Sequence, residues 1–325
     1  MNKKDRVLAA LGGEEVDRVP VAAWRHFPGE DYTAEDQIQS FVSFQKKYDW
    51  DFMKLMFRNS FLLEDWGCTV KEPQVPYGYY LPEKYAVNQT EDWKKLSPLD
   101  PFQGTLGEMI TVVRGVRDIK GEEILKLGTV FVPLMVARQL AGDKKMLQDL
   151  RDNPSVLHEA LNVITQTLIE FSIALLDNGA DGIFIATQSN NPGFMSQQEY
   201  AEFGHPYNLK VLRQIEDRSL FTMLHVCQVK PRFDEFVDYP VHAINWDDRI
   251  TSPSLVEARK KTDKCLIGGV DKERVLRNGT PDQVNQQVHD AIQSAGRKKM
   301  IVGVGCGIPV DCPDENLFAM RKAVE

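Results

Sequence analysis

Asn178-Gly179-Ala180-Asp181-Gly182-Ile183-Phe184-Ile185-Ala186 is the stretch that decides the fold. Its first three residues carry the signal of a helix C-terminus, because Asn and Gly readily adopt the backbone conformation that ends a helix. The helix that ends here is predicted to start at Asn153-Pro154. The apolar run 182–186 that follows reads as a short buried strand. A long helix followed directly by a buried strand predicts a βα unit in a parallel sheet.

The same alternation of short apolar runs and helical periodicity continues to the end of the chain. Further helix starts are predicted at Ser196, at Thr280-Pro281 and at Asp311-Cys312-Pro313. Eight runs read as strands: 19–24, 51–57, 127–132, 182–186, 220–225, 243–246, 265–268 and 300–303. Eight strands with helices between most of them favour an α/β fold of the (β/α)8 type, a TIM barrel, over an open doubly wound sheet.

The segment from about 58 to 120 fits this alternation poorly. It contains a Tyr79-Tyr80 pair and five prolines, at positions 73, 76, 82, 98 and 101. We interpret it as a long insertion that covers the barrel mouth. No internal repeat or Pro/Gly linker divides the chain, so a single domain over 1–325 is predicted.

Composition narrows the classes of function. The net charge of −8, from 39 basic and 47 acidic residues, argues against a general nucleic-acid surface, which needs clustered Lys and Arg. The run Arg297-Lys298-Lys299 reads as a solvated helix end. Five cysteines, at 68, 227, 265, 306 and 312, are too few for a disulfide-stapled secreted fold. The start of the chain lacks a signal-type apolar core, and no stretch approaches the roughly 20 apolar residues of a membrane helix. We therefore expect a cytoplasmic protein without a membrane anchor.

A His and two Cys residues form the strongest candidate site. His225 and Cys227 project from the same side of the chain at the end of the predicted strand 220–225, and Cys306 follows the strand 300–303. The carboxyl ends of barrel strands share one face, so these side chains are expected to converge. Imidazole and thiolate are zinc ligands, and three of them leave one position open, as in catalytic zinc sites.

Other readings of these residues remain open. Free Cys is often buried as a small apolar residue, and His225 could be a hydrogen-bonded core histidine. Asp247, after the strand 243–246, is equally consistent with a weak fourth ligand and with a plain carboxylate at the barrel rim. Cys312 is a rival ligand, whereas Cys68 and Cys265 read as packing residues.

Several segments carry a resemblance to a known family. They are Asp17-Arg18-Val19-Pro20-Val21, Asn178-Gly179-Ala180-Asp181-Gly182, Ile244-Asn245-Trp246-Asp247, Gly268-Gly269-Val270-Asp271, Cys306-Gly307-Ile308-Pro309 and Pro313-Asp314-Glu315-Asn316-Leu317. Together they resemble the uroporphyrinogen decarboxylase superfamily over nearly the whole chain. The resemblance implies a (β/α)8 barrel, in agreement with the strand pattern.

The superfamily that the chain resembles contains enzymes of two reaction classes. True decarboxylases carry an Arg-Gln-Ala-Gly-Arg segment that binds substrate carboxylates and an aspartate that gathers pyrrole N–H groups. Here the first segment is Trp24-Arg25-His26-Phe27-Pro28-Gly29-Glu30, with at most one of the arginines, and Asn59 stands near the place of the aspartate. An amide cannot supply the negative charge of that aspartate. These departures argue against porphyrinogen decarboxylation, which is kept as the alternative together with decarboxylation of a smaller carboxylated substrate.

The second branch contains corrinoid-dependent methyltransferases, which carry a His-x-Cys pair and a distant Cys in a Gly-Cys-Gly context. His225, Cys227 and Cys306 match that pattern. The resemblance therefore implies a zinc-dependent methyltransferase that moves a methyl group to a thiol or related acceptor. The methylcobalamin is expected on a separate corrinoid protein, because the chain has no Asp-x-His-x-x-Gly segment. A barrel that binds a corrinoid or tetrapyrrole without catalysis is a third possibility.

Several polar residues are predicted to line a substrate pocket at the barrel mouth. They are Arg25, His26, Asn59, Tyr79, Tyr80, Gln188 and Asn190. Each is equally consistent with an ordinary surface or lid residue. Related barrels often pair, so a homodimer is a further expectation.

Overall fold

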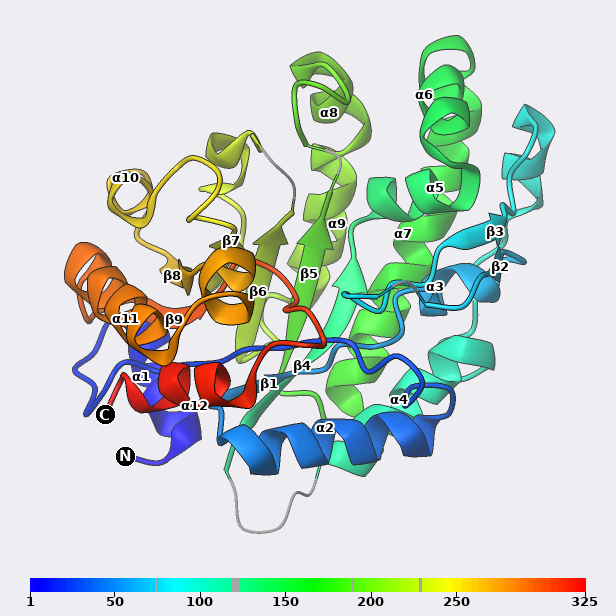
Figure 1. Ribbon diagram of the computed structural model, residues 1–325. Helices are drawn as coiled ribbons and strands as arrows, with labels where there is room; N and C mark the ends of the chain where they lie inside the picture. The colour runs from blue at the N-terminus through cyan, green and yellow to red at the C-terminus, as the bar shows by residue number, and fades with distance from the viewer. Residues whose placement is uncertain (74, 118–122, 189, 228–229) are drawn as a thin grey trace.

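A curled parallel sheet forms the centre of the molecule (Figure 1). The structure is a computed structural model that describes residues 1–325 except 74, 118–122, 189 and 228–229. Seven strands follow one another in the order β1, β4, β5, β6, β7, β8, β9. Their bounds are Phe52–Lys54, Leu125–Phe131, Gly182–Thr187, Phe221–Val226, Ala243–Trp246, Cys265–Val270 and Met300–Val304. All six pairings between neighbours in this sheet are parallel, as the βα pattern predicts.

The eighth barrel position is occupied by an irregular segment around Val21. Val21 bridges Val302 of β9 in parallel, and on its other side its carbonyl accepts a hydrogen bond of 3.0 Å from Asp51 N, next to β1. The N–H of Val21 donates to the Asp51 carboxylate at 2.8 Å, and Pro20 has no N–H. The predicted strand 19–24 is therefore too long. The segment forms a single bridge at Val21, because Asp51 takes the Val21 N–H and Pro20 has none. The predicted TIM-barrel arrangement is confirmed.

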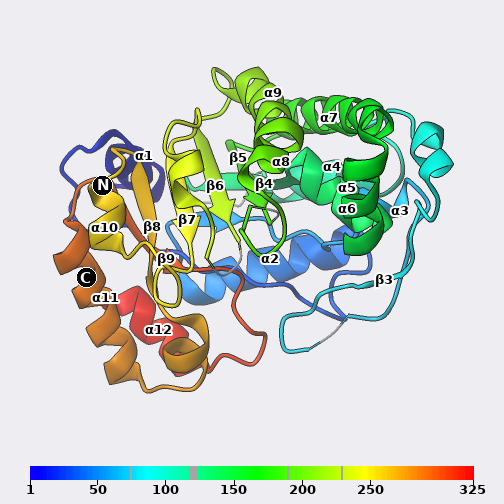
Figure 2. The same cartoon turned by 90° about the horizontal axis from the view of Figure 1, so that it is seen from above.

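Helices surround this sheet, as the view from above shows (Figure 2). They include α1 (Lys3–Gly12), α2 (Ala34–Tyr48), α5 (Pro133–Ala141), α6 (Asp143–Asp152), α7 (Pro154–Asp177), α8 (Gln197–Phe203), α9 (His205–Ile215), α10 (Leu255–Arg259), α11 (Pro281–Ala295) and α12 (Asp314–Lys322), with short helical turns η2 (Phe233–Phe236) and η3 (Lys272–Arg277). The predicted caps are present: Ser196 caps α8 and Thr280 caps α11, each in a capping box. Helix α1 contacts β1, β4, β8 and β9 and covers the N-terminal end of the barrel.

Helix α7 corrects one expectation about membranes. By length and composition alone it is apolar enough to cross a bilayer, contrary to the expectation that no stretch is. In the structure it packs against α4, α5, α9, β4 and β5, and its apolar side belongs to the protein core. A core helix buried on a wide face passes the same compositional test as a membrane span.

The segment 58–120 contains two different parts. Its first part carries α3 (Phe61–Glu64), an antiparallel pair of β2 (Thr69–Val70) with β3 (Pro82–Lys84), and η1 (Thr90–Lys95). The last part is a regular helix, α4 (Gly104–Val116), which packs against α2 and α7 in the outer layer. Only the first part departs from the barrel pattern.

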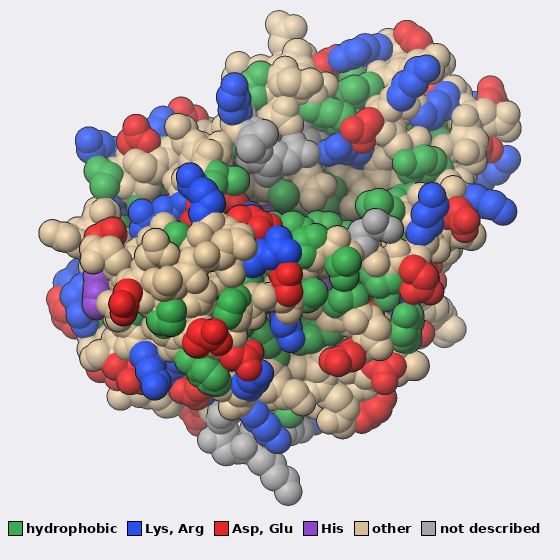
Figure 3. Space-filling model, viewed as in Figure 1, with side chains coloured by type: hydrophobic (Ala, Val, Ile, Leu, Met, Phe, Trp, Pro, Cys, Tyr) green, Lys and Arg blue, Asp and Glu red, His purple; other side chains and the backbone are tan. Residues whose placement is uncertain are grey.

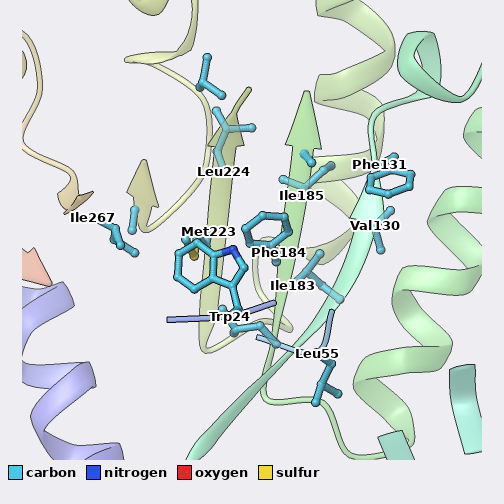
Figure 4. Packing of buried hydrophobic residues seen from close by; sticks show 14 of the residues in the cluster. Trp24, Leu55, Val130, Phe131, Ile183, Phe184, Ile185, Met223, Leu224 and Ile267 are labelled. Atoms are coloured by element: carbon cyan, nitrogen blue, oxygen red, sulfur yellow. The ribbon is translucent and has the colours of Figure 1, made fainter. Parts of the chain in front are cut away.

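The barrel interior is filled by large apolar side chains (Figure 4). Trp24 lies 6.1 Å from the Phe184 ring and 6.2 Å from the Phe52 ring, measured between ring centroids. These residues are at most 3% exposed. The strands therefore enclose packed side chains, and chemistry is restricted to the end of the barrel where the strands finish.

The surface seen in Figure 3 mixes both signs of charge. Lys and Arg side chains are interspersed with Asp and Glu over this face, which is hollowed in its upper half. The strand arrows in Figure 1 point toward this upper side, so the hollow lies on the side of the carboxyl ends.

Candidate metal centre and cavity

Three side chains meet at the carboxyl ends of the strands. His225 belongs to β6, Cys227 follows β6 directly, and Cys306 lies two residues beyond β9. One ligand atom of each lies within 4.8 Å of those of the other two. Residues separated by 79 positions are thus brought together because β6 and β9 end at the same rim, as the sequence predicts.

His225 is held with one ring nitrogen turned toward the two thiols. Its Nδ1 lies 2.7 Å from Asn245 Oδ1, across the pair that these residues form between β6 and β7. The Asn245 amide donates both its hydrogens, to Ile267 O and to Val304 O, each at 2.9 Å. Because its amide orientation is fixed in this way, Asn245 Oδ1 must accept, and His225 Nδ1 carries the proton. The Nε2 lone pair is left free.

The structure supplies a direct test of whether a metal fits here. His225 Nε2 is buried and has no hydrogen-bond partner among the described atoms. An unpaired buried acceptor costs on the order of 1–3 kcal/mol, so native proteins rarely retain one without a ligand. One imidazole nitrogen and two sulfurs form a donor set that suits Zn²⁺. These residues therefore fit a zinc ion.

The two thiols form an interacting pair. The hydrogen bond from Cys227 lowers the pKa of Cys306 well below its ordinary value, and the charge of Lys272 acts in the same direction. The same hydrogen bond, together with burial, raises the pKa of Cys227. The two thiols therefore titrate as a coupled pair, in which Cys306 loses its proton before Cys227. A divalent cation bound here would displace the remaining thiol proton.

Three donors surround these sulfur atoms. Gln188 Nε2 lies 3.8 Å from Cys227 Sγ. Burial raises the pKa of the Tyr79 phenol, and its interactions with the two thiols, including a side-chain hydrogen bond to Cys306, act in the same direction. Lys272 interacts electrostatically with both thiols and forms an ion pair with Asp247. Of these three donors only Lys272 is charged, and its charge is shared with Asp247.

The prediction of Asp247 as a fourth ligand does not match this geometry. Among the described residues, the group whose ligand atoms meet contains His225, Cys227 and Cys306 and omits Asp247. The Asp247 carboxylate pairs with Lys272 instead and lies against Gly305. The position of Asp247 agrees with the other interpretation, a carboxylate at the rim of the barrel. Cys68, Cys265 and Cys312 are buried and lie outside the group.

A cavity of about 250 Å³ opens beside the three candidate ligands. Of the predicted pocket residues, the structure brings four to its wall: His26, Asn59, Tyr79 and Gln188. Asn59 also clasps the backbone of Tyr80, donating to its carbonyl at 2.9 Å and accepting from its N–H at 2.7 Å. These two hydrogen bonds hold the backbone of the insertion next to Tyr79, which lines the cavity.

Three predicted pocket residues point elsewhere. The Arg25 guanidinium lies over the rings of Phe27 and Phe44 and donates to a backbone carbonyl at 2.7 Å. Tyr80 donates its hydroxyl to Asp31 at 2.7 Å. Asn190 accepts from Arg232 at 3.1 Å. None of the three lines the cavity within the described part of the chain.

Sequence reasoning missed three residues of this region. Asn245 lies in a segment quoted for the family resemblance, and its pairing with His225 becomes visible only through the β6–β7 register. Lys272 is the second residue after strand β8 and follows Asp271. Lys54 lines the cavity from β1 and is 6% exposed. The signal for Lys54 was present, since a lysine in a predicted buried strand is unusual.

Comparisons with known proteins agree with this picture. The family model of uroporphyrinogen decarboxylase (URO-D) matches residues 2–325. The methylcobamide:CoM methyltransferase MtbA of Methanosarcina acetivorans is 23% identical over 347 residues, covering 99% of this chain and 97% of that protein. The uroporphyrinogen decarboxylase of Microcystis aeruginosa is 24% identical over 233 residues, covering 69% of this chain and 64% of that enzyme.

The fold has a near counterpart among solved structures. A methyltransferase from Methanosarcina mazei superposes with a TM-score of 0.87 at 21% identity, covering 99% of this chain and 98% of that one. The family model spans almost every residue, including the strand ends that carry the candidate metal centre. The chain therefore belongs to the uroporphyrinogen decarboxylase family.

Proposed function

We propose that this protein is a zinc-dependent methyltransferase that moves a methyl group from a methylated corrinoid protein to a small thiol. The observation that carries the proposal is the convergence of His225 Nε2 with the sulfurs of Cys227 and Cys306 beside a cavity. The names of relatives that match this chain over nearly their whole length, methylcobamide:CoM methyltransferases, support the same reaction class.

The chain's own residues prepare the site for that reaction. Asn245 holds His225 in the tautomer that leaves Nε2 free as a ligand. Cys227 and Cys306 supply two thiolates, and Lys272 places a positive charge beside them. Zinc held by these three residues would keep an acceptor thiol in its thiolate form at neutral pH.

The apolar cavity wall excludes water from the acceptor. Trp24, Phe131 and Phe184 line the cavity and leave room for a small molecule beside the ligands. A methylated corrinoid would supply the methyl group: the acceptor sulfur would bond to the methyl carbon, and the electron pair of the broken cobalt–carbon bond would stay with the corrinoid. Removing water preserves the sulfur as a nucleophile.

The methyl donor is proposed to arrive on a partner protein. The chain contains no Asp-x-His-x-x-Gly segment of the cobalamin-binding type. Five free cysteines, two of them at the candidate metal centre, suit a reducing compartment such as the cytoplasm.

Elemental analysis combined with methyl transfer tests the proposal. Wild-type protein is expected to bind one zinc per chain and to demethylate methylcobalamin in the presence of a thiol. Cys227→Ser and Cys306→Ser are expected to lose both properties. Cys68→Ala is the matched control, because Cys68 is a buried thiol outside the candidate ligand group. Wild-type protein that takes up no zinc would refute the proposal.

Decarboxylation of a porphyrinogen has less support. Arg25, the one arginine retained in the segment typical of decarboxylases, is turned away from the cavity. Asn59 offers an amide there, already bonded to the Tyr80 backbone. Release of CO₂ from uroporphyrinogen without added metal would reverse this ranking.

A further inference from the structure

Two lysines on neighbouring strands are buried to the same degree but have different partners. Lys54 on β1 is 6% exposed, and Lys126 on β4 is 7% exposed. The Lys126 amine donates to a backbone carbonyl at 2.9 Å and lies 3.8 Å from the Asp181 carboxylate. The Lys54 amine contacts the Met56 thioether and lies 4.3 Å from the centroid of the Phe184 ring. Within the described part of the chain, no carboxylate pairs with Lys54.

These surroundings favour the neutral form of the Lys54 amine. A thioether and an aromatic face are weak partners for an ammonium group. Burial therefore lowers the pKa of Lys54 to about 7, although the charge of Cys306 acts in the opposite direction. A neutral amine has a free lone pair, so Lys54 can act as a nucleophile at neutral pH.

The Lys54 amine also faces a space that a small molecule can enter. Lys54 lines the cavity of about 250 Å³ together with Trp24, Phe131 and Phe184. Leu81 lines the same cavity and is 48% exposed, so the cavity reaches the surface of the protein. A mostly apolar wall with few polar groups suits a compact, uncharged molecule.

His26 places a group that can transfer protons in the same cavity. It is 4% exposed, and its Nδ1 is buried without a partner among the described atoms. Burial and the nearby Lys54 lower the pKa of His26 to about 3, so its ring is neutral at pH 7. A neutral imidazole has one N–H and one lone pair, so it can give a proton at one nitrogen and accept one at the other.

We propose that Lys54 is a covalent binding site for a small aldehyde or ketone, which its amine binds as an imine inside the cavity. A carbonyl compound of this size is uncharged and fits the mostly apolar wall. Its carbon is an electrophile, and the Lys54 amine is a nucleophile that no acidic side chain neutralises. The inference goes beyond the proposed function and requires neither zinc nor a corrinoid.

Imine formation needs no oxidant and no reductant. Lys54 Nζ bonds to the carbonyl carbon, and the π electrons of the carbonyl group move to its oxygen. One proton passes from the nitrogen to that oxygen, which gives a carbinolamine. The C–O bond then breaks as the second amine proton follows, so that one water leaves and a C=N bond remains. The neutral His26 ring would carry these protons between the two atoms.

Reductive trapping followed by peptide mapping tests the site. Metal-free and zinc-loaded protein are each mixed with acetaldehyde or acetone and excess cyanoborohydride at pH 7, and mass spectrometry follows the alkylation of each lysine. At pH 7 about half of the Lys54 amine is neutral, against less than about one in a thousand for an ordinary lysine. Lower basicity makes an amine a weaker nucleophile, which offsets part of this advantage. Lys54 is therefore expected to be alkylated about 30-fold faster than Lys126 and the exposed lysines.

Variants assign the reaction to the cavity. Lys54→Met is expected to lose the rapidly alkylated site, whereas Lys126→Met is expected to retain it. His26→Gln keeps a polar side chain without the proton transfer, and it should slow the alkylation of Lys54 on the order of tenfold. An unchanged rate in His26→Gln would overturn the role of His26.

The outcomes separate this inference from the proposed function. If wild-type protein is alkylated at Lys54 no faster than at Lys126 and the exposed lysines, the covalent site is overturned and the methyltransferase is unaffected. Protein that takes up no zinc but is rapidly alkylated at Lys54 would refute the proposed function and support the covalent site. The comparison of lysines within wild-type protein decides the question even if Lys54→Met does not fold.

Discussion

The two ends of the cavity are built in different ways. The metal end is formed by residues on or next to regular strands, and hydrogen bonds to neighbouring strands orient His225 through Asn245. The opposite end is formed by the short strand β1, the irregular segment that carries His26, and Tyr79 from the insertion. The candidate metal ligands thus lie on the regular part of the barrel, whereas the opposite wall of the cavity is built from segments that depart from it.

Removal of a ligand at the metal end is expected to give the largest effect. Cys306→Ala deletes one of three protein donors and should weaken zinc binding on the order of 1000-fold, because structural zinc sites derive several kcal/mol from each ligand. Competition with a metallochromic chelator measures the affinity. Lys54→Met, at the other end, should bind zinc as wild type does. A similar loss of zinc affinity in both variants would show that the two ends of the cavity do not differ in their role in zinc binding.

At the opposite end of the cavity, Lys54→Met is expected to stabilise the metal-free protein by a few kcal/mol at pH 7. The folded protein binds the Lys54 proton less readily than the unfolded chain, because burial lowers its pKa from 10.5 to about 7. The penalty is therefore complete below pH 7 and disappears as the pH rises toward 10.5. The groups that act on Lys54 are Cys306, which favours the ammonium, and His26, which stays neutral in this range.

Urea unfolding of both proteins at pH 7 and at pH 9.5 measures this effect. The stability difference between variant and wild type should shrink at the higher pH. Lys126→Met controls for the loss of a buried lysine elsewhere in the sheet. If the stability difference does not change with pH, burial of the protonated Lys54 amine does not destabilise the folded protein.

Asn245→Leu probes the support behind the metal end. Without Asn245 Oδ1, the His225 ring loses the partner that fixes its tautomer, and zinc affinity should fall about 10- to 100-fold. The variant also leaves Ile267 O and Val304 O without their donor, so its thermal stability must be measured beside its zinc affinity. Unchanged zinc affinity in a folded variant would mean that strand geometry alone orients His225.

The smallest expected effect concerns the insertion. Tyr77 donates its hydroxyl to Glu273 after β8 and stacks on Tyr79, with centroids 5.5 Å apart. Tyr77→Phe removes that hydrogen bond, worth about 1 kcal/mol, and should raise the KM for the thiol less than tenfold. Initial rates over a range of thiol concentrations measure it. A large fall in zinc content instead would tie the insertion to the metal end.

The convergence of His225, Cys227 and Cys306 was predicted from the sequence, because strand ends of a barrel share one rim. Their role as metal ligands stays a prediction. The opposite end of the cavity was predicted less well. There, neighbouring residues point in opposite directions. His26 and Tyr79 line the cavity, whereas Arg25 and Tyr80 turn away from it. In an irregular segment no periodicity decides which neighbour faces inward.

The length of the predicted strand 19–24 was also decided by a contact that the local sequence does not show. The apolar pattern of 19–24 predicts a strand, yet the Asp51 carboxylate takes the N–H of Val21, and Arg6 and Arg18 hold that carboxylate in place. Such long-range side-chain bonds are invisible to local sequence patterns. The order of the barrel positions was nevertheless correct, because it depends on the alternation of elements alone.

The size of the cavity has a consequence for the order of events under the proposed function. The cavity of about 250 Å³ has room for a small molecule such as a short thiol. Under the proposed function, the cobalt is expected to stay above the opening of the cavity while the methyl group is transferred to the acceptor inside. A corrinoid partner docked over the mouth would close the entrance, so the acceptor is expected to enter first. The reaction is expected to show ordered addition, with the partner itself serving as the final wall of the active site.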